Sequence, residues 1–155
     1  MKKILVLTVL LFLFVSFQSF ALIGIGGAFA IDPIGSAIPG AALSIQYPDL
    51  APFLLGVGFS IGSDTFQIGL TGDYWFVKDA LAGALSYYVG LGGYLQYAGA
   101  MDFGLRVPVG IQIWPLNPLE LFVEVAPSVG IVLSDPIVFP NWGIQGAFGF
   151  RFWFD

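Results

Sequence analysis

The sequence contains no cysteine and no histidine. Without cysteine, the chain can form neither a disulfide framework nor a thiolate metal site, and it offers no cysteine for lipidation. Without histidine, a Ser-His-Asp triad and a histidine-ligated metal are both excluded. The sequence therefore predicts no catalytic residue, no metal and no cofactor, and we do not expect an enzyme.

Charged residues are also scarce. They make up 10% of the chain, whereas a typical soluble protein has about 25%. Hydrophobic residues account for 57% and aromatic residues for 17%, so too few charges remain to cover a surface that faces water. The formal net charge of −5 disfavours nucleic acid and anionic lipid as partners.

The first 21 residues have the three parts of a secretory signal. Lys2 and Lys3 precede an apolar run over residues 4–15, and Ser19-Phe20-Ala21 has the small residues that a signal peptidase prefers. We predict cleavage after Ala21, which leaves residues 22–155 as a single domain exported through a bacterial inner membrane. The alternative is a retained helical anchor, for which the apolar run is short.

Residues after this leader alternate between apolar and polar or small side chains, the period of a strand with one apolar face. Every odd position in residues 103–114 is apolar, and in residues 119–131 Glu120 and Glu124 share the opposite face. A membrane-spanning chain must be helical or form a closed barrel, because its backbone groups need internal partners. The helical alternative has one candidate, the uncharged stretch 80–101, but that stretch also alternates.

Eight such runs occur, separated by breakers rich in glycine, proline and aspartate. Eight strands form the smallest usual barrel, and an even number places both termini at the same end. The predicted fold class is all-β: an eight-stranded antiparallel up-and-down transmembrane β-barrel. The predicted strands are residues 22–31, 41–47, 53–61, 65–76, 85–97, 103–114, 119–131 and 142–154.

If the apolar face contacts lipid, the other face lines the barrel interior. An eight-stranded barrel is just wide enough for its side chains to fill, so a free aqueous pore is not expected. The predicted interior residues are Gln46, Gln67, Thr71, Asp73, Tyr88, Tyr94, Gln96, Arg106, Gln112, Trp114, Glu120, Phe122, Glu124, Gln145, Arg151 and Trp153.

Five of these residues form a predicted charge cluster inside the barrel, with Arg106 and Arg151 as its only cations, faced by Asp73, Glu120 and Glu124. In one of the two registers that the alternation allows for the last hairpin, Glu120 lies directly opposite Arg151. Such a pair can fix the register and fill the interior, or serve as a polar gate or ligand clamp, and the sequence leaves both open. Glu120 and Glu124 are about 13 Å apart on a strand, too far for glycosidase chemistry.

The sequence also predicts strand bulges at two prolines and four acidic loops outside the barrel. Pro108 and Pro127 lie within predicted strands, where each removes a ladder donor, so we expect bulges there. Short acidic loops are expected to face the cell exterior around Asp32, Asp64, Asp102 and Asp135.

The tail Gly149-Phe150-Arg151-Phe152-Trp153-Phe154-Asp155 resembles the closing strand of outer-membrane barrels. This resemblance implies that Phe150, Phe152 and Phe154 are read by the barrel-assembly machinery, although here one aspartate follows the last phenylalanine. The whole of residues 22–155 resembles the OmpA-type and OmpW-type small barrels. The segment 118–127, together with the tail, is similar to small spirochaete-type barrels of unassigned function.

The expected function is that of an outer-membrane protein with a structural or surface-interaction role. Its expected partners are outer-membrane lipid, the assembly machinery and an extracellular protein. The alternative is an OmpW-like conduit for small hydrophobic molecules, prompted by the apolar, glycine-rich interior of the first three strands and marked by a lateral gap or a cavity. A soluble lipocalin-like carrier is disfavoured, because its outward faces would expose a large apolar surface to water.

Overall fold

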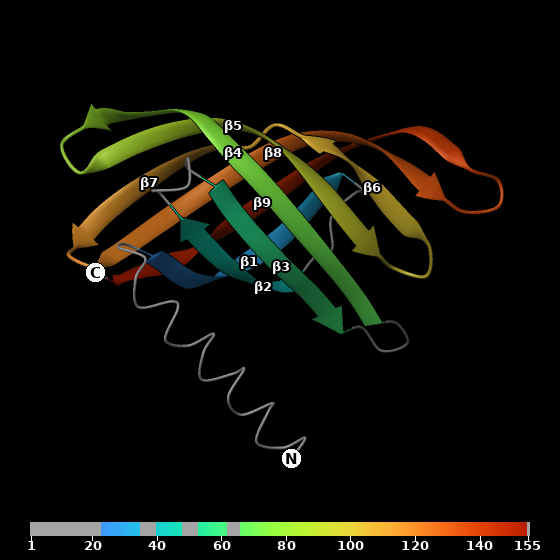
Figure 1. Ribbon diagram of the computed structural model, residues 1–155, viewed down its shortest axis with the longest axis horizontal. Coiled ribbons are helices and arrows are strands. Elements are labelled where there is room, and N and C mark those ends of the chain that lie inside the picture. Colours follow the sequence, from blue (N-terminus) through green and yellow to red (C-terminus); the bar gives the residue numbers. More distant parts are fainter. Residues whose placement is uncertain (1–22, 35–39, 48–52, 62–65, 155) are drawn as a thin grey trace, which may run out of the picture.

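The computed structural model describes residues 23–34, 40–47, 53–61 and 66–154, without the side chains of residues 32–34, 53–54 and 60–61. The predicted signal peptide, residues 1–21, therefore lies outside the described residues, as do Asp64 and Asp155. Nine β-strand segments follow one another along the chain (Figure 1). They are β1 (Ile23–Ile34), β2 (Gly40–Tyr47), β3 (Phe53–Ile61), β4 (Phe66–Ala82), β5 (Leu85–Tyr97), β6 (Met101–Arg106), β7 (Val109–Leu116), β8 (Leu119–Leu133) and β9 (Val138–Phe154).

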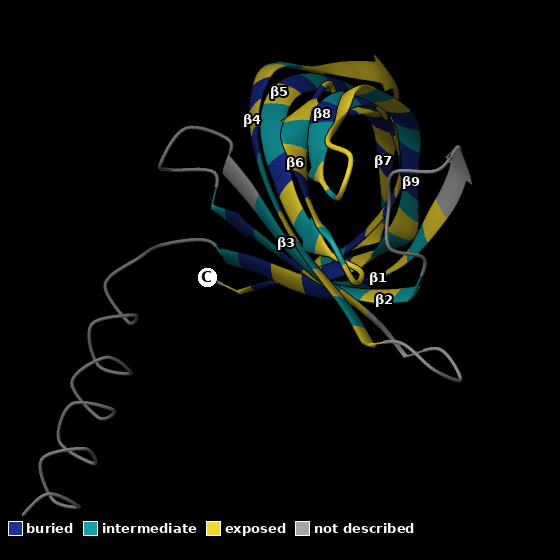
Figure 2. Cartoon of the chain, turned by 90° about the vertical axis from the view of Figure 1, so that its right-hand side faces the viewer, coloured by how far each residue is buried: buried dark blue, intermediate teal, exposed yellow. Residues whose placement is uncertain are grey.

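These segments form one closed antiparallel ring with eight strand positions. Strands β1 to β5 pair in chain order, and β8 pairs with β9. β6 and β7 share one position, where each pairs with β5 and β8, and β1 pairs with β9 to close the ring (Figure 2). Ile23 pairs with Phe154, so both ends of the described chain lie at one end of the barrel. The predicted fold class, an eight-stranded up-and-down barrel of the transmembrane type, is confirmed.

The helical alternative for residues 80–101 is wrong, because these residues form the end of β4, all of β5 and the start of β6. Among the residues that the structure describes, no helix combines the length and apolarity needed to cross a bilayer.

The expected bulges at the two prolines are also absent from the described pairing. Arg106 pairs with Ser128 and Val109 with Val125, so β6 and β7 keep one register against β8 across the gap. Within that gap, the Val107 amide donates to the Pro127 carbonyl at 2.9 Å. Each proline therefore removes one donor from a ladder pair without inserting a residue, which interrupts the predicted strand 103–114 but does not bend it by a bulge.

A bulge occurs instead in β4, which continues to Ala82 rather than ending at residue 76. The register against β5 shifts between Trp75 and Val77, and Lys78 then pairs with Tyr88, an interior residue. A one-residue shift exchanges the two faces of a strand, so Lys78 lies on the inner face. Lys78 is exposed there, so Arg106 and Arg151 remain the only buried cations among the described residues, and Lys78 is a further inward-pointing cation that the sequence did not predict.

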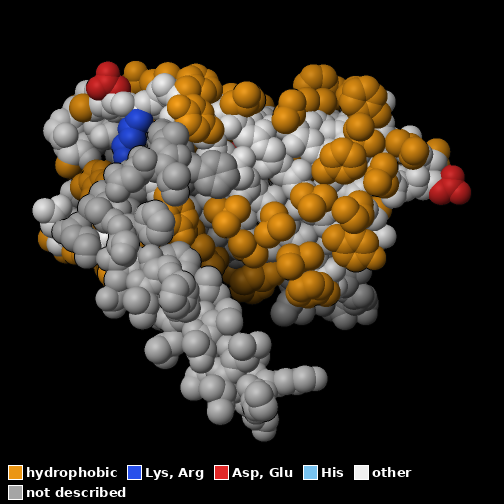
Figure 3. All heavy atoms as spheres, viewed as in Figure 1, with side chains coloured by type: hydrophobic (Ala, Val, Ile, Leu, Met, Phe, Trp, Pro, Cys, Tyr) orange, Lys and Arg blue, Asp and Glu red, His pale blue; other side chains and the backbone are white. Residues whose placement is uncertain are grey.

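Charge is concentrated inside the barrel and apolar residues outside it. Six of the nine charged side chains that the structure describes are buried, and the other three, Lys78, Asp79 and Asp135, are exposed near strand ends. Hydrophobic side chains cover the middle of the face drawn in Figure 3, with the visible charges at its two ends. This is the reverse of a soluble protein, in which charges face water and apolar side chains form the core.

Candidate functional site: the barrel interior

All sixteen residues predicted for the interior are buried or half-buried. Twelve are buried, and Gln67, Thr71, Gln96 and Trp114 are half-buried. Large side chains stand opposite glycine, as the limited width requires. A Cβ added to Gly110, for example, would lie 2.3 Å from Cζ of Tyr88, so the tyrosine ring occupies the space that a side chain at position 110 would need.

The first polar centre is built around Arg106, at the end of β6. Its Nε atom lies 3.0 Å from Oδ1 of Asp73 on β4. The two groups form an ion pair, but their geometry is not that of a hydrogen bond. The Nη2 atom of Arg106 pairs with Oε1 of Glu124 on β8, and its Nη1 atom donates to Oε1 of Gln145 on β9 at 2.6 Å. Tyr88 donates to the second oxygen of Glu124 at 2.8 Å. Arg106 thus links three strands across the interior.

The second polar centre is built around Arg151, on β9. The register of β8 and β9 places Glu120 opposite Arg151, which is the predicted pairing, and the two side chains form a fully buried ion pair. Arg151 Nε donates to Ser44 Oγ at 2.8 Å, and Nη1 lies 3.3 Å from Oε1 of Gln46. The guanidinium also lies 3.9 Å from the centroid of the Phe122 ring, close enough for a cation–π interaction.

The five predicted charges therefore form two centres rather than one cluster. Asp73, Arg106 and Glu124 belong to the first centre, and Glu120 and Arg151 to the second. In both centres a buried cation faces at least one buried carboxylate, the arrangement that makes a charge tolerable away from water. Whether the centres are purely structural or act as a gate stays a prediction.

An aromatic layer lies on the side of these centres toward the β4–β5 turn. Trp75 and Tyr88 stack with ring centroids 3.7 Å apart, and Trp114 and Trp153 lie 5.3 Å apart. Lys78 Nζ lies 5.7 Å from the Trp75 centroid and 6.0 Å from that of Trp153. Trp75 was not among the predicted interior residues although its parity pointed inward, and Lys78 was hidden by the bulge.

Asp102 also departs from the prediction. It was expected in an external acidic loop, but it lies in β6 with its side chain buried in the barrel. It accepts hydrogen bonds from Tyr94 at 3.1 Å, Gln96 at 3.0 Å and Asn141 at 3.0 Å. Strand β6 begins at Met101, so residue 102 already follows the alternation of the strand. Of the other expected loop acids, Asp135 is exposed between β8 and β9, and the Asp32 side chain lies outside the described residues.

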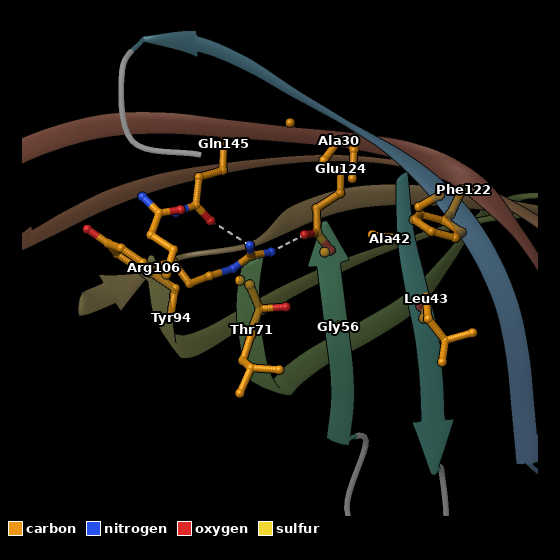
Figure 4. Close-up of a pocket in the computed structure, with 18 of the residues that line it drawn as sticks. Ala30, Ala42, Leu43, Gly56, Thr71, Tyr94, Arg106, Phe122, Glu124 and Gln145 are labelled. Carbon is orange, nitrogen blue, oxygen red and sulfur yellow. Dashed lines mark hydrogen bonds and ion pairs between the residues drawn. The ribbon is translucent and has the colours of Figure 1, made fainter. Parts of the chain in front are cut away.

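A cavity of about 100 Å³ lies between the two polar centres and the opposite wall. Figure 4 shows Arg106 between Gln145 and Glu124 at this cavity, with Leu43 pointing away from them. Most of the residues that β1 to β4 contribute there are small, apart from Leu43 and Leu70, and the charged residues all come from β6, β8 and β9. The small-residue wall consists of Ala28, Ala30, Ala42, Ser44, Gly56, Gly58, Gly69 and Thr71.

The predicted assembly residues face outward from the closing strand. Phe150 and Phe152 are each 43% exposed and Phe154 is 55% exposed. Their strand, β9, pairs with β1 and β8, so it joins the end of the barrel sheet to its beginning. Recognition of these three side chains by the assembly machinery stays a prediction.

No protein-family model matches the chain, and no curated protein matches it in sequence. Among solved structures, the chain is similar to Ail, the attachment invasion locus protein of Yersinia pestis, with 14% identity, 86% of this chain and 97% of that chain covered, and a TM-score of 0.48. Neisserial surface protein A (NspA) has 14% identity over 84% and 95% of the chains and a TM-score of 0.47. OmpT, an outer membrane protein of Vibrio cholerae, has 16% identity over 86% and 52% of the chains and a TM-score of 0.31.

Proposed function

We propose that the chain is a bacterial outer-membrane β-barrel with a structural and surface-interaction role, and that its filled interior does not conduct water or ions. The observation that carries the proposal is the reversed distribution of charge, with six of the nine described charges buried inside and the three exposed ones confined to strand ends and a turn. A bilayer is the solvent that suits such a surface, because lipid stabilises apolar side chains and excludes unpaired charge.

Most strand positions are long enough for this environment. A transmembrane strand needs about 9–11 residues, and β5 and β8 have 13 and 15 residues. Their outward side chains include Leu91, Leu95, Val123 and Val125, all exposed. A soluble carrier would have to present this surface to water, where an apolar patch of more than a few hundred Å² favours association.

The filled interior supports a non-conducting protein. Arg106 and Arg151 reach toward opposite carboxylates in the middle of the barrel, and the aromatic layer with Lys78 lies beside them. Moving either arginine aside to open a path would separate a buried ion pair, which is costly. The interaction surface would then be the end of the barrel opposite the termini, where the β8–β9 turn exposes Asp135 and Ile137 and the start of β9 exposes Phe139.

The test is flux through reconstituted protein. Residues 22–155 would be refolded into liposomes, and the uptake of a small sugar and the conductance of planar bilayers would be measured against protein-free controls. We expect both to equal the controls. Sugar uptake or stable conductance steps would contradict the filled interior while leaving the barrel architecture in place.

A second candidate function is an OmpW-like conduit for small hydrophobic molecules. The cavity beside the small-residue wall of β1 to β4 favours it. The test is uptake of a small apolar solute into liposomes, comparing the native chain with a cavity-filling variant, Gly58→Val. Uptake that the variant abolishes would favour the conduit, and uptake equal to that of empty liposomes would exclude it. Closer kinship with OmpA-type, OmpW-type or spirochaete-type barrels is likewise a proposal.

A further inference from the structure

The cavity has the construction of a binding site. Arg151 lines it and is fully buried, and its Nη2 atom has no hydrogen-bond partner among the residues that the structure describes. Gln46, whose Oε1 atom faces Arg151 Nη1 at 3.3 Å, also has a buried Nε2 atom without a partner in that part of the chain. A buried donor without an acceptor costs about 1–3 kcal/mol, so the Arg151 Nη2 donor favours an oxygen atom in the cavity, which Gln46 itself does not line.

The rest of the cavity favours a small apolar body attached to that oxygen. Alanine and glycine form its wall on β1 to β3, and Phe122 closes another side. A volume of about 100 Å³ corresponds to roughly three water molecules, and it is below the roughly 150 Å³ of an engineered apolar cavity that holds benzene. A space of this size suits a molecule of only a few heavy atoms.

The charged residues around the cavity disfavour an anionic ligand. Arg151 is paired with Glu120, and Arg106 faces both Asp73 and Glu124. A further carboxylate beside Glu124, which also lines the cavity, would be buried without a cation of its own, and such a charge is expensive. A neutral acceptor satisfies the free donor without this cost.

We propose that this cavity binds a small neutral molecule carrying an acceptor oxygen, such as a short-chain ketone or alcohol, with the oxygen on Arg151 and the carbon chain against the β1–β3 wall. The site rests on the barrel of the proposed function but not on transport, since a molecule can bind there without crossing.

Arginine side chains give a direct probe, because the chain contains only two arginines. Residues 22–155 labelled with nitrogen-15 at arginine Nε would be refolded into detergent micelles and titrated with acetone. Ser44→Ala identifies the Arg151 signal, because Arg151 Nε donates to the Ser44 hydroxyl. We expect the Arg151 signal to shift and saturate, whereas the Arg106 signal moves less because its guanidinium already contacts Asp73, Glu124 and Gln145.

A matched pair of variants tests the location. A Cβ at Gly58 would lie 4.0 Å from the Cβ of Ala42 and 4.0 Å from the Gly69 carbonyl, so Gly58→Val adds methyl groups to the cavity without a close contact at its Cβ. Gly27→Val makes the same change on the outer face, where a Cβ would lie 3.7 Å from the Phe150 ring. Gly27→Val should retain the saturable shift and Gly58→Val should lose it, with Ala42→Val as a second filling variant if Gly58→Val does not fold.

The outcomes separate the site from the fold. Circular dichroism and a heat-dependent gel shift on the same samples report the barrel independently of the titration. A folded native barrel with no saturable shift would overturn the site and leave the barrel standing. An equal shift in the native chain and in a folded filling variant would also overturn it, because acetone would then be acting elsewhere.

Discussion

Removal of the Arg151 guanidinium tests whether the second polar centre holds the barrel together. Arg151→Met keeps a long side chain at position 151 but removes the ion pair with Glu120 and the hydrogen bond to Ser44. Glu120 is then a fully buried carboxylate whose remaining described donor is Trp153 Nε1, at 2.7 Å. Breaking a buried pair by removing one partner costs about 3–5 kcal/mol, so we expect a loss of that size in the free energy of unfolding.

A second substitution separates the lost pair from lost packing. Glu120→Gln in the Arg151→Met background removes the stranded charge but keeps an acceptor for Trp153, so the double variant should recover about 2 kcal/mol. The assay is urea unfolding of the refolded barrel in liposomes, followed by tryptophan fluorescence. Asp135→Asn, at an exposed turn residue, is the control and should change the free energy by less than about 0.5 kcal/mol. A loss below about 1 kcal/mol in Arg151→Met, or a double variant no more stable than the single one, would refute the reasoning.

Three further substitutions probe the wall and the tail. Gly110→Ala should lower the free energy of unfolding by about 1–3 kcal/mol, because its Cβ would meet the Tyr88 ring at 2.3 Å; an unchanged urea midpoint would count against the packing described. Pro127→Ala should raise it by about 0.5–1 kcal/mol, because the new amide lies opposite Val107, whose own amide already bonds to residue 127; lower stability would show that the proline is needed. Phe154→Ser should reduce the folded yield in cells but not refolding in micelles, and equal loss in both would assign Phe154 to stability rather than to assembly.

Much of the architecture could be predicted from the sequence because the two faces of a barrel wall have different surroundings, lipid outside and packed side chains inside. Successive side chains along each strand point alternately to these two faces. The alternation identified all eight strand positions, most of the inward-facing residues and two allowed registers for the last hairpin, one of which gives the observed pairing of Glu120 with Arg151. A pairing of this kind can be narrowed to two registers because a one-residue slip of either strand would place one of the two charges outside.

The errors arose where one residue changes the parity or where a turn is shorter than expected. The bulge after Trp75 turns Lys78 inward, and no local pattern marks it in the sequence. Asp102 follows a short turn at residues 98–100, so it belongs to the strand rather than to the loop. The separation of the charges into two centres, and the cavity between them and the β1–β4 wall, depend on the three-dimensional arrangement of several strands, which the alternation along one strand does not specify.

The central claim is that residues 22–155 form a membrane-embedded barrel, and its most direct test is refolding into detergent micelles. Unheated and boiled samples would be compared on a denaturing gel, with circular dichroism measured on the same material. We expect a β spectrum and a heat-dependent shift in mobility, because a closed barrel resists the detergent until it is boiled. A helical spectrum with no mobility shift would contradict the barrel.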